Sequence, residues 1–184
     1  MTFSELLASD LPLLKELQPP DWNNIVPPFE YHISHSFCHT RKIMDGNRLA
    51  AVGTTVLHKD VAWLALIIVH PDYRGQGLGK KITMDLMDIA TKHECESILL
   101  LATPMGLPVY EKLGFIPVNH GHPFAYICCR NQVCHSLYRI ESLVPHCILL
   151  FYDSDFYGWF IQRKPRSGWI WYYSCFGPSP KRAF

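Results

Sequence analysis

Apolar runs and helical periodicity alternate along the chain up to Val118 in the order expected of an α/β protein. Val61 to Val69 is almost continuously apolar, which is typical of a strand covered on both faces at the centre of a sheet. Apolar residues then recur at helical spacing from Leu78 to His93, and Ser97 to Ala102 is a second apolar strand. A strand, a helix and a strand in this order predict a right-handed crossover between two parallel strands.

The N-terminal part predicts a strand, a helix and a loop. Thr2 to Leu6 favours a short strand, and Asp10 suits the N-cap of a helix. This helix would turn three leucines toward a core: Leu11, Leu14 and Leu17. From Asp21 to His39 the sequence is irregular, and Pro27-Pro28 breaks any long element, so we expect a loop with room for one helical turn. Such a loop would form a wall of a substrate site.

Turn signals define the other elements of the core. Asp45-Gly46-Asn47 separates two extended runs, Phe37 to Met44 and Arg48 to His58, and predicts an antiparallel hairpin. Pro104 to Leu113 predicts a short helix that ends at Gly114.

The sequence after Val118 carries no clear periodicity, although it is rich in aromatic residues. Phe151 to Phe176 would supply closing strands, an interface or part of a second lobe. We therefore expect residues 1–119 to form the core domain. Residues 120–184 would complete the fold, form an interface or belong to a partial second lobe.

Charge composition limits the classes of partner. The 17 Lys and Arg nearly balance the 16 Asp and Glu, so no field of one sign is available to gather nucleic acid or an anionic membrane. Charged residues interrupt the first twenty positions, which excludes a signal peptide or a membrane span there. These features predict a soluble, cytoplasmic protein that binds neither nucleic acid nor membrane.

The seven cysteines are an odd number without regular spacing, as in reduced cytosolic thiols. A zinc site could draw its ligands from five residues of the right types, but they lack the paired Cys-x-x-Cys spacing of such sites. They are Cys128, Cys129, Cys134, His135 and Cys147. Another set, His32, His35 and His39, would share a helical face only if the proline-containing segment were helical. We expect no metal site.

The segment that joins the central strand to the following helix is suited to hold phosphate. Its glycines let backbone N–H groups approach phosphate oxygens, and the helix N-terminus adds partial positive charge. The residues expected to contact the pyrophosphate are Arg74, Gly75, Gln76, Gly77, Leu78, Gly79 and Lys80. A dinucleotide fingerprint needs glycine at Lys80, and a Walker loop needs glycine at Arg74, so neither fits.

This loop resembles the acetyl-CoA loop of the GNAT superfamily of N-acetyltransferases, Arg/Gln-x-x-Gly-x-Gly/Ala, and residues 67–73 precede it as in that family. Tyr110-Glu111-Lys112-Leu113-Gly114-Phe115 looks like the family's Tyr-Glu-x-Leu-Gly-Phe segment. The two matches cover about residues 48–118. The resemblance implies the GNAT fold, an α/β fold with a mixed central β-sheet and helices on both faces.

The resemblance also implies an acyltransferase that moves an acetyl group from its co-substrate acetyl-CoA to a primary amine of a small molecule or a peptide. Backbone groups of Ile67, Ile68 and Val69 would bind the pantetheine arm and the thioester carbonyl. The Tyr110 hydroxyl would meet the departing thiolate as the catalytic acid.

One feature departs from the family pattern. An amine with a pKa of about 10.4 must lose a proton before it attacks, and many relatives supply a carboxylate on the central or the following strand. Those strands carry none here, which leaves Glu30, His120 or His122 as candidate bases, directly or through water. A second hypothesis therefore stays open, a non-catalytic acyl-CoA-binding or regulatory module. The C-terminal aromatics would fit a small apolar amine or a homodimer contact.

Overall fold

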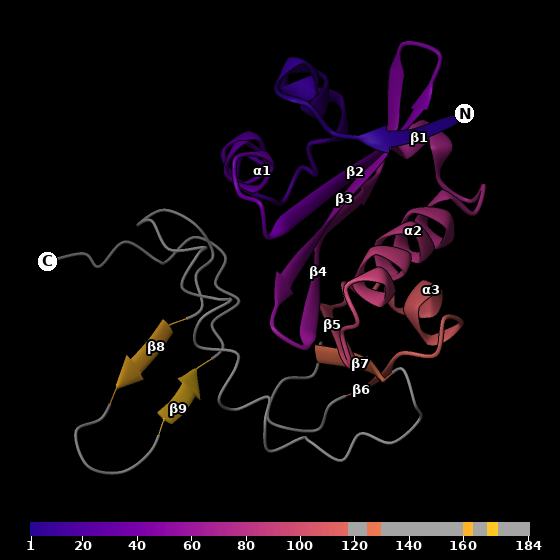
Figure 1. Ribbon diagram of the computed structural model, residues 1–184. Coiled ribbons are helices and arrows are strands. Elements are labelled where there is room, and N and C mark those ends of the chain that lie inside the picture. The colour runs from indigo at the N-terminus through magenta and orange to yellow at the C-terminus, as the bar shows by residue number, and fades with distance from the viewer. Residues whose placement is uncertain (118–124, 130–159, 164–168, 173–184) are drawn as a thin grey trace, which may run out of the picture. The chain divides into compact units, whose positions relative to one another are not determined.

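The computed structural model describes residues 1–117, 125–129, 160–163 and 169–172 (Figure 1). The chain divides into two compact units, Met1–Leu137 and Tyr138–Phe184. In the second unit, β8 (Phe160–Arg163) and β9 (Trp169–Tyr172) form an antiparallel two-stranded sheet of their own. Strands therefore do occur within the aromatic segment.

The first unit holds a seven-stranded mixed sheet in the order β1-β2-β3-β4-β5-β7-β6. Its strands are β1 Thr2–Glu5, β2 Cys38–Asp45, β3 Arg48–His58, β4 Val61–Val69, β5 Ser97–Leu101, β6 Ile116–Pro117 and β7 Ala125–Cys129. The β2–β3 hairpin and the central position of β4 are as predicted. The strands β4 and β5 are parallel, which confirms the predicted orientation of these two strands.

Helices cover both faces of this sheet, as the predicted fold class requires (Figure 1). The crossover helix α2 (Leu78–Lys92) and the short α3 (Leu107–Glu111) lie against one face. The 3₁₀ helix η1 (Ala8–Leu17) and α1 (Val26–Ile33) lie against the other. Each face buries a separate apolar cluster, so β3 and β4 lie between two cores. No helix in the described part of the chain is long and apolar enough to cross a membrane.

The predicted capping role of Asp10 is wrong. The helix is a 3₁₀ helix that starts at Ala8, which places Asp10 in its first turn. The Leu7 N–H donates to the Asp10 carboxylate at 2.7 Å, and the same carboxylate pairs with Lys42 of β2. The buried leucines of this helix, Leu14 and Leu17, face the core as predicted.

The loop predicted between Asp21 and His39 contains α1, so that prediction is also wrong. Pro27 and Pro28 occupy the first turn of α1. A proline is tolerated there because the first N–H groups of a helix have no intrahelical acceptor. The two prolines therefore start a helix that they were expected to break.

Candidate functional site

The central strands β4 and β5 part where β4 is distorted. Their ladder pairs Val61 through Leu64 with Ser97 through Leu100 and, among the described residues, extends no further. Beyond it, Leu66 has a left-handed φ of 51°. The register with β3 shifts there, so that Leu66 and Ile67 stand opposite the single residue Gly53. This β-bulge bends β4 and leaves its last residues without β5 as a partner.

The parting exposes backbone groups of β4 on its β5 side. The His70 N–H donates to the Ala50 carbonyl of β3 at 2.9 Å, so by alternation the Val69 backbone groups point away from β3. The Val69 carbonyl accepts a bond from Arg74 Nε at 3.3 Å. By the same alternation, the backbone groups of Ile67 point away from β3, and those of Ile68 point toward it. Of the three predicted backbone contacts, Ile67 and Val69 thus have the better orientation for an extended ligand.

The glycine loop that follows β4 presents unpaired N–H groups. Gly75 and Gly77 have left-handed φ values of 75° and 78°, which favour glycine. Helix α2 begins at Leu78, and the Lys81 N–H donates to the Gly77 carbonyl. Within the part of the chain that the structure describes, the backbone N–H groups of residues 75–80 donate to no other residue. This arrangement at the N-terminus of a helix is suited to bind an anion.

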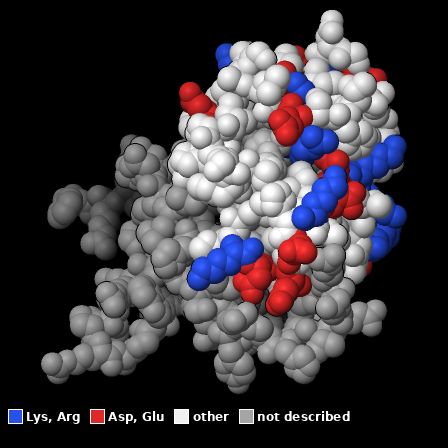
Figure 2. All heavy atoms as spheres, viewed as in Figure 1, with Lys and Arg blue, Asp and Glu red and all other residues white. Residues whose placement is uncertain are grey.

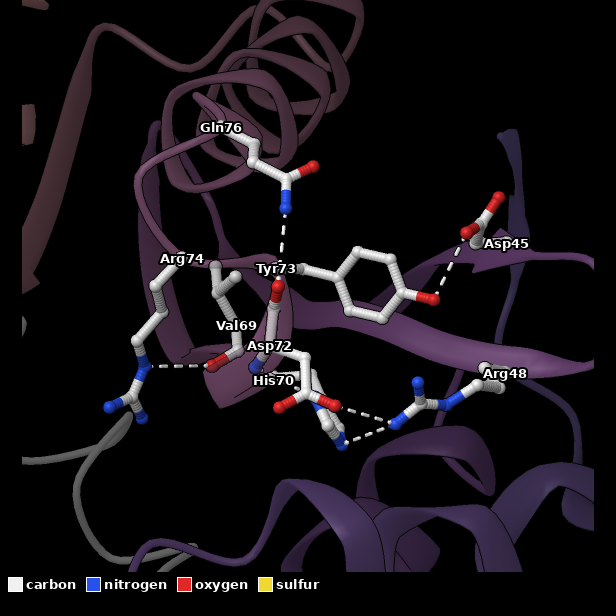
Figure 3. A network of polar contacts seen from close by, with 8 residues as sticks. All are labelled: Asp45, Arg48, Val69, His70, Asp72, Tyr73, Arg74 and Gln76. Carbon is white, nitrogen blue, oxygen red and sulfur yellow. Dashed lines mark hydrogen bonds and ion pairs between the residues drawn. The ribbon is translucent and has the colours of Figure 1, made fainter.

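Two side chains of the loop fold back on the chain instead of pointing outward (Figure 3). Arg74 Nε donates to Val69, and Gln76 Nε2 donates to the Asp72 carbonyl at 3.2 Å. The side chains thus brace the loop, while its backbone remains available for a ligand.

Tyr110 lies on α3 and is 7% exposed. Its ring packs edge-on against Phe115 at 6.0 Å between centroids, and Gly106 lies so close that a Cβ there would be 2.8 Å from Tyr110 Cε2. Burial raises the pKa of the Tyr110 hydroxyl to about 12. The hydroxyl therefore keeps its proton at neutral pH, and it bonds to no residue in the described ranges.

This pKa changes the expected form of acid catalysis. Against a thiol pKa of about 8.5, complete transfer of the Tyr110 proton would be uphill by about 5 kcal/mol. The hydroxyl is thus suited to donate a hydrogen bond to a developing thiolate rather than to give up its proton.

The candidate bases are not brought together. Glu30 lies exposed on α1, and His120 and His122 lie outside the described residues. The zinc candidates Cys128 and Cys129 fall on β7, and the other three zinc candidates also lie outside the described residues. Within the described part, no group of three His, Cys, Asp or Glu side chains is arranged to hold a metal.

The sequence did not identify His32 of α1 as a buried polar residue. It is 1% exposed, and its Nδ1 lies 3.1 Å from Thr54 Oγ1, which lies 3.1 Å from Thr40 Oγ1. Thr54 pairs with Ala65, directly before the bulge of β4. Burial lowers the pKa of His32 to about 4, so the imidazole is neutral and is too weak a base to deprotonate an ammonium group. A sequence signal could have located this buried histidine. Two prolines suit a first helical turn, and Phe29 and His32 follow them at helical spacing.

Charges on the molecular surface are mixed. Figure 2 shows Lys and Arg side chains interspersed with Asp and Glu over the described part of the face in view. No large area of one sign covers that part, so a charged ligand depends on local groups such as those of the glycine loop.

A sequence profile of the Acetyltransferase (GNAT) family matches residues 4–115, from β1 to the end of the segment that contains Tyr110. The chain belongs to the GNAT family. This match confirms the recognised family and the predicted fold. Both sequence blocks that carried the resemblance lie inside the matched range.

Similar curated proteins share only part of this GNAT chain. Glucosamine 6-phosphate N-acetyltransferase of Trypanosoma brucei brucei is 47% identical over 49 residues, which are 27% of this chain and 33% of that protein. The uncharacterized N-acetyltransferase ycf52 of Pyropia yezoensis is 40% identical over 50 residues, 27% of this chain and 29% of that one. The chain thus spans about a third of the length of these relatives.

Solved GNAT structures match more of the chain. The ribosomal-protein-S18-alanine N-acetyltransferase of Escherichia coli has a TM-score of 0.57 at 26% identity, over 68% of this chain and 90% of that one. The PaiA N-acetyltransferase of Thermoplasma acidophilum, solved in complex with coenzyme A, has a TM-score of 0.60 at 15% identity. That match covers 70% of this chain and 98% of the other, and it shows the shared fold.

Proposed function

We propose that this chain is an N-acetyltransferase that moves the acetyl group of acetyl-CoA to a primary amine. The observation that carries the proposal is a juxtaposition at the end of β4. A strand edge and a glycine loop whose N–H groups have no partner among the described residues are followed by a helix N-terminus, all within residues 65–80. These are the groups needed by a ligand that has an extended arm and a pyrophosphate.

The residues divide the reaction between binding and chemistry. The β4 edge around Ile67 and Val69 aligns the pantetheine arm and donates to the thioester oxygen as negative charge develops there. The amine nitrogen forms a bond to the acetyl carbon and loses a proton, and the carbon–sulfur bond breaks. The Tyr110 hydroxyl donates a hydrogen bond to the departing sulfur. The proton of the amine passes to a base or to water, with Glu30, His120 and His122 as the candidates.

An amine acceptor is supported by the names of two relatives. One is a glucosamine 6-phosphate N-acetyltransferase and the other an N-acetyltransferase of an alanine of a ribosomal protein. A small-molecule amine and a peptide amine therefore both remain candidates. A homodimer and a cytoplasmic location stay predictions.

The test combines binding with turnover on the full chain. Calorimetry with acetyl-CoA should give saturable binding, and thiol release should depend on a member of a panel of amino sugars, polyamines and peptides. Absence of acetyl-CoA binding would contradict the proposal.

The lack of a carboxylate on β4 and β5 favours one alternative, a non-catalytic acyl-CoA-binding module. Tight binding of acetyl-CoA, with no thiol release for any amine of the panel, would support that alternative.

A further inference from the structure

One arginine outside the glycine loop contacts the segment that leads into it. Arg48, the first residue of β3, places Nη2 3.0 Å from the Asp72 carboxylate and 3.5 Å from His70 Nε2 (Figure 3). Its guanidinium carbon also lies 5.6 Å from the centre of the Tyr73 ring. A single side chain therefore contacts three residues of the turn between β4 and the loop.

His70 and Asp72 form the centre of this turn. His70 is 7% exposed, and its Nδ1 accepts the Asp72 N–H at 3.2 Å, which caps the short 3₁₀ helix η2 (Pro71–Tyr73). A neutral imidazole has one acceptor nitrogen, and this bond uses it. The approach of Arg48 to Nε2 is therefore weak, and its bond to the Asp72 carboxylate carries the interaction.

The turn is also held from the other side of the β2–β3 hairpin. The Tyr73 hydroxyl donates to the carboxylate of Asp45 at 3.0 Å, and Asp45 pairs with Arg48 across the hairpin. Gln76 of the glycine loop in turn donates to the carbonyl of Asp72. Arg48 thus holds the side chain of Asp72, and the backbone carbonyl of Asp72 holds the side chain of Gln76.

The glycines beyond Asp72 lack such support. An added Cβ at Gly75 or Gly77 would have no atom of a described residue within 4 Å. Their conformation therefore depends on the two ends of the loop, which are α2 on one side and the turn held by Arg48 on the other. A loop that is already ordered loses less conformational entropy when a ligand binds.

We propose that Arg48 is a positioning residue, which holds the glycine loop in its ligand-ready conformation through Asp72. This inference rests on the proposed function, because it assumes that the loop binds the pyrophosphate of CoA. Arg48 acts on the affinity for that group and leaves the chemistry at Tyr110 unchanged.

The first test is a double-mutant cycle with CoA as the probe. Arg48→Ala and Asp72→Asn should each raise the Kd by about two- to fivefold, the upper part of the range expected for an exposed ion pair. The double variant should be no weaker than the weaker single variant, because both changes break the same contact. Arg41→Ala is the matched control, because it also removes one positive charge and one ion pair. Arg41 Nε donates to the Asp85 carboxylate at 2.6 Å, and Asp85 lies on α2 about two turns beyond the loop.

The second test separates positioning from a general structural role. With acetyl-CoA as the donor, Arg48→Ala should raise KM and leave kcat unchanged. With S-acetylpantetheine, which has no pyrophosphate, the same variant should match the wild type in kcat/KM. Arg48→Lys keeps the charge without the planar fork, and it should recover part of the affinity.

Three outcomes would overturn the inference. They are an unchanged Kd in Arg48→Ala, additive losses in the cycle, or equal losses with both donors. Additive losses would mean that Arg48 attracts the ligand directly, and equal losses would mean that it supports the whole fold. A wild-type protein that does not bind CoA would instead remove the proposed function itself.

Discussion

The site proposed to bind acetyl-CoA, here called the donor side, differs from the face under α1 in the kind of polar group that it offers. The donor side offers backbone groups, and the face under α1 offers side chains. On the donor side, the end of β4, the glycine loop and the start of α2 offer backbone N–H groups that lie within residues 67–80. Under α1 the polar groups are buried side chains: His32 from a helix, and Thr40 and Thr54 from two strands. Backbone binding requires glycines in one short segment. A side-chain cluster is dispersed along the sequence and leaves no local pattern.

The strongest way to break the donor side is a charged side chain at Gly77. Gly77→Glu places a carboxylate beside the pyrophosphate and strains a backbone with φ of 78°, so CoA binding should fall by at least about 100-fold. Gly77→Gln is the matched control, because it keeps the size and the strain but removes the charge, and it should bind with intermediate affinity. Calorimetry on variants with wild-type circular dichroism decides the matter. Wild-type affinity in Gly77→Glu would show that the loop is only a turn.

Removal of the Tyr110 hydroxyl separates binding from chemistry within the donor side. Tyr110→Phe should lower turnover by roughly 10- to 1,000-fold with the best acceptor, because the hydrogen bond strengthens as charge develops on sulfur. Affinity for acetyl-CoA should stay within about twofold, since an uncharged hydroxyl adds little to ground-state binding. Equal turnover in both proteins would make Tyr110 a packing residue.

The raised pKa of Tyr110 adds a pH criterion. Because the folded-state pKa is about 12, the hydroxyl remains protonated across the working range. Rates should therefore show no alkaline loss from this group below about pH 11. An alkaline limb near pH 10 that disappears in Tyr110→Phe would contradict the assignment.

The face under α1 is tested through stability. Burial depresses the pKa of His32 to about 4. As the pH falls, the unfolded chain therefore binds a proton at this site at a higher pH than the folded chain does. The free energy of unfolding should decrease as the pH falls from about 6.5 to about 4, by an amount on the order of 3 kcal/mol. Urea unfolding of the wild type and of His32→Gln at several pH values measures this contribution. Equal slopes in the two proteins would show that His32 contributes none of the pH dependence.

The same contrast explains which parts of the fold could be predicted. The bounds of β4 follow from its continuous apolar sequence, and α2 follows from its periodicity and the glycines before it. The bulge at Leu66 could not be predicted, because a leucine carries no signal for a left-handed φ. Pro27-Pro28 was assigned to the wrong role, since the same dipeptide breaks a helix interior and suits a first turn. Arg48 and Asp72 are 24 residues apart in the sequence, and the antiparallel pairing of β3 with β4 brings them together.

A smaller change can test how strongly turnover depends on the position of the Tyr110 hydroxyl. A Cβ at Gly106 would lie 2.8 Å from Tyr110 Cε2 and 3.3 Å from its hydroxyl oxygen, so Gly106→Ala must displace the ring. Since the ring is buried against Phe115, the displacement moves the hydroxyl relative to the site. We expect turnover to fall by about three- to tenfold, less than for Tyr110→Phe, because a misplaced donor still interacts in part.

The double variant with Tyr110→Phe identifies the cause of this loss. If Gly106→Ala acts by moving the hydroxyl, it should cost little further turnover once the hydroxyl is absent. Steady-state thiol release on the four proteins, with acetyl-CoA affinity measured beside it, gives the coupling. A full second loss in the Tyr110→Phe background would mean that Gly106 acts on another part of the site, such as the path of the acceptor to the thioester.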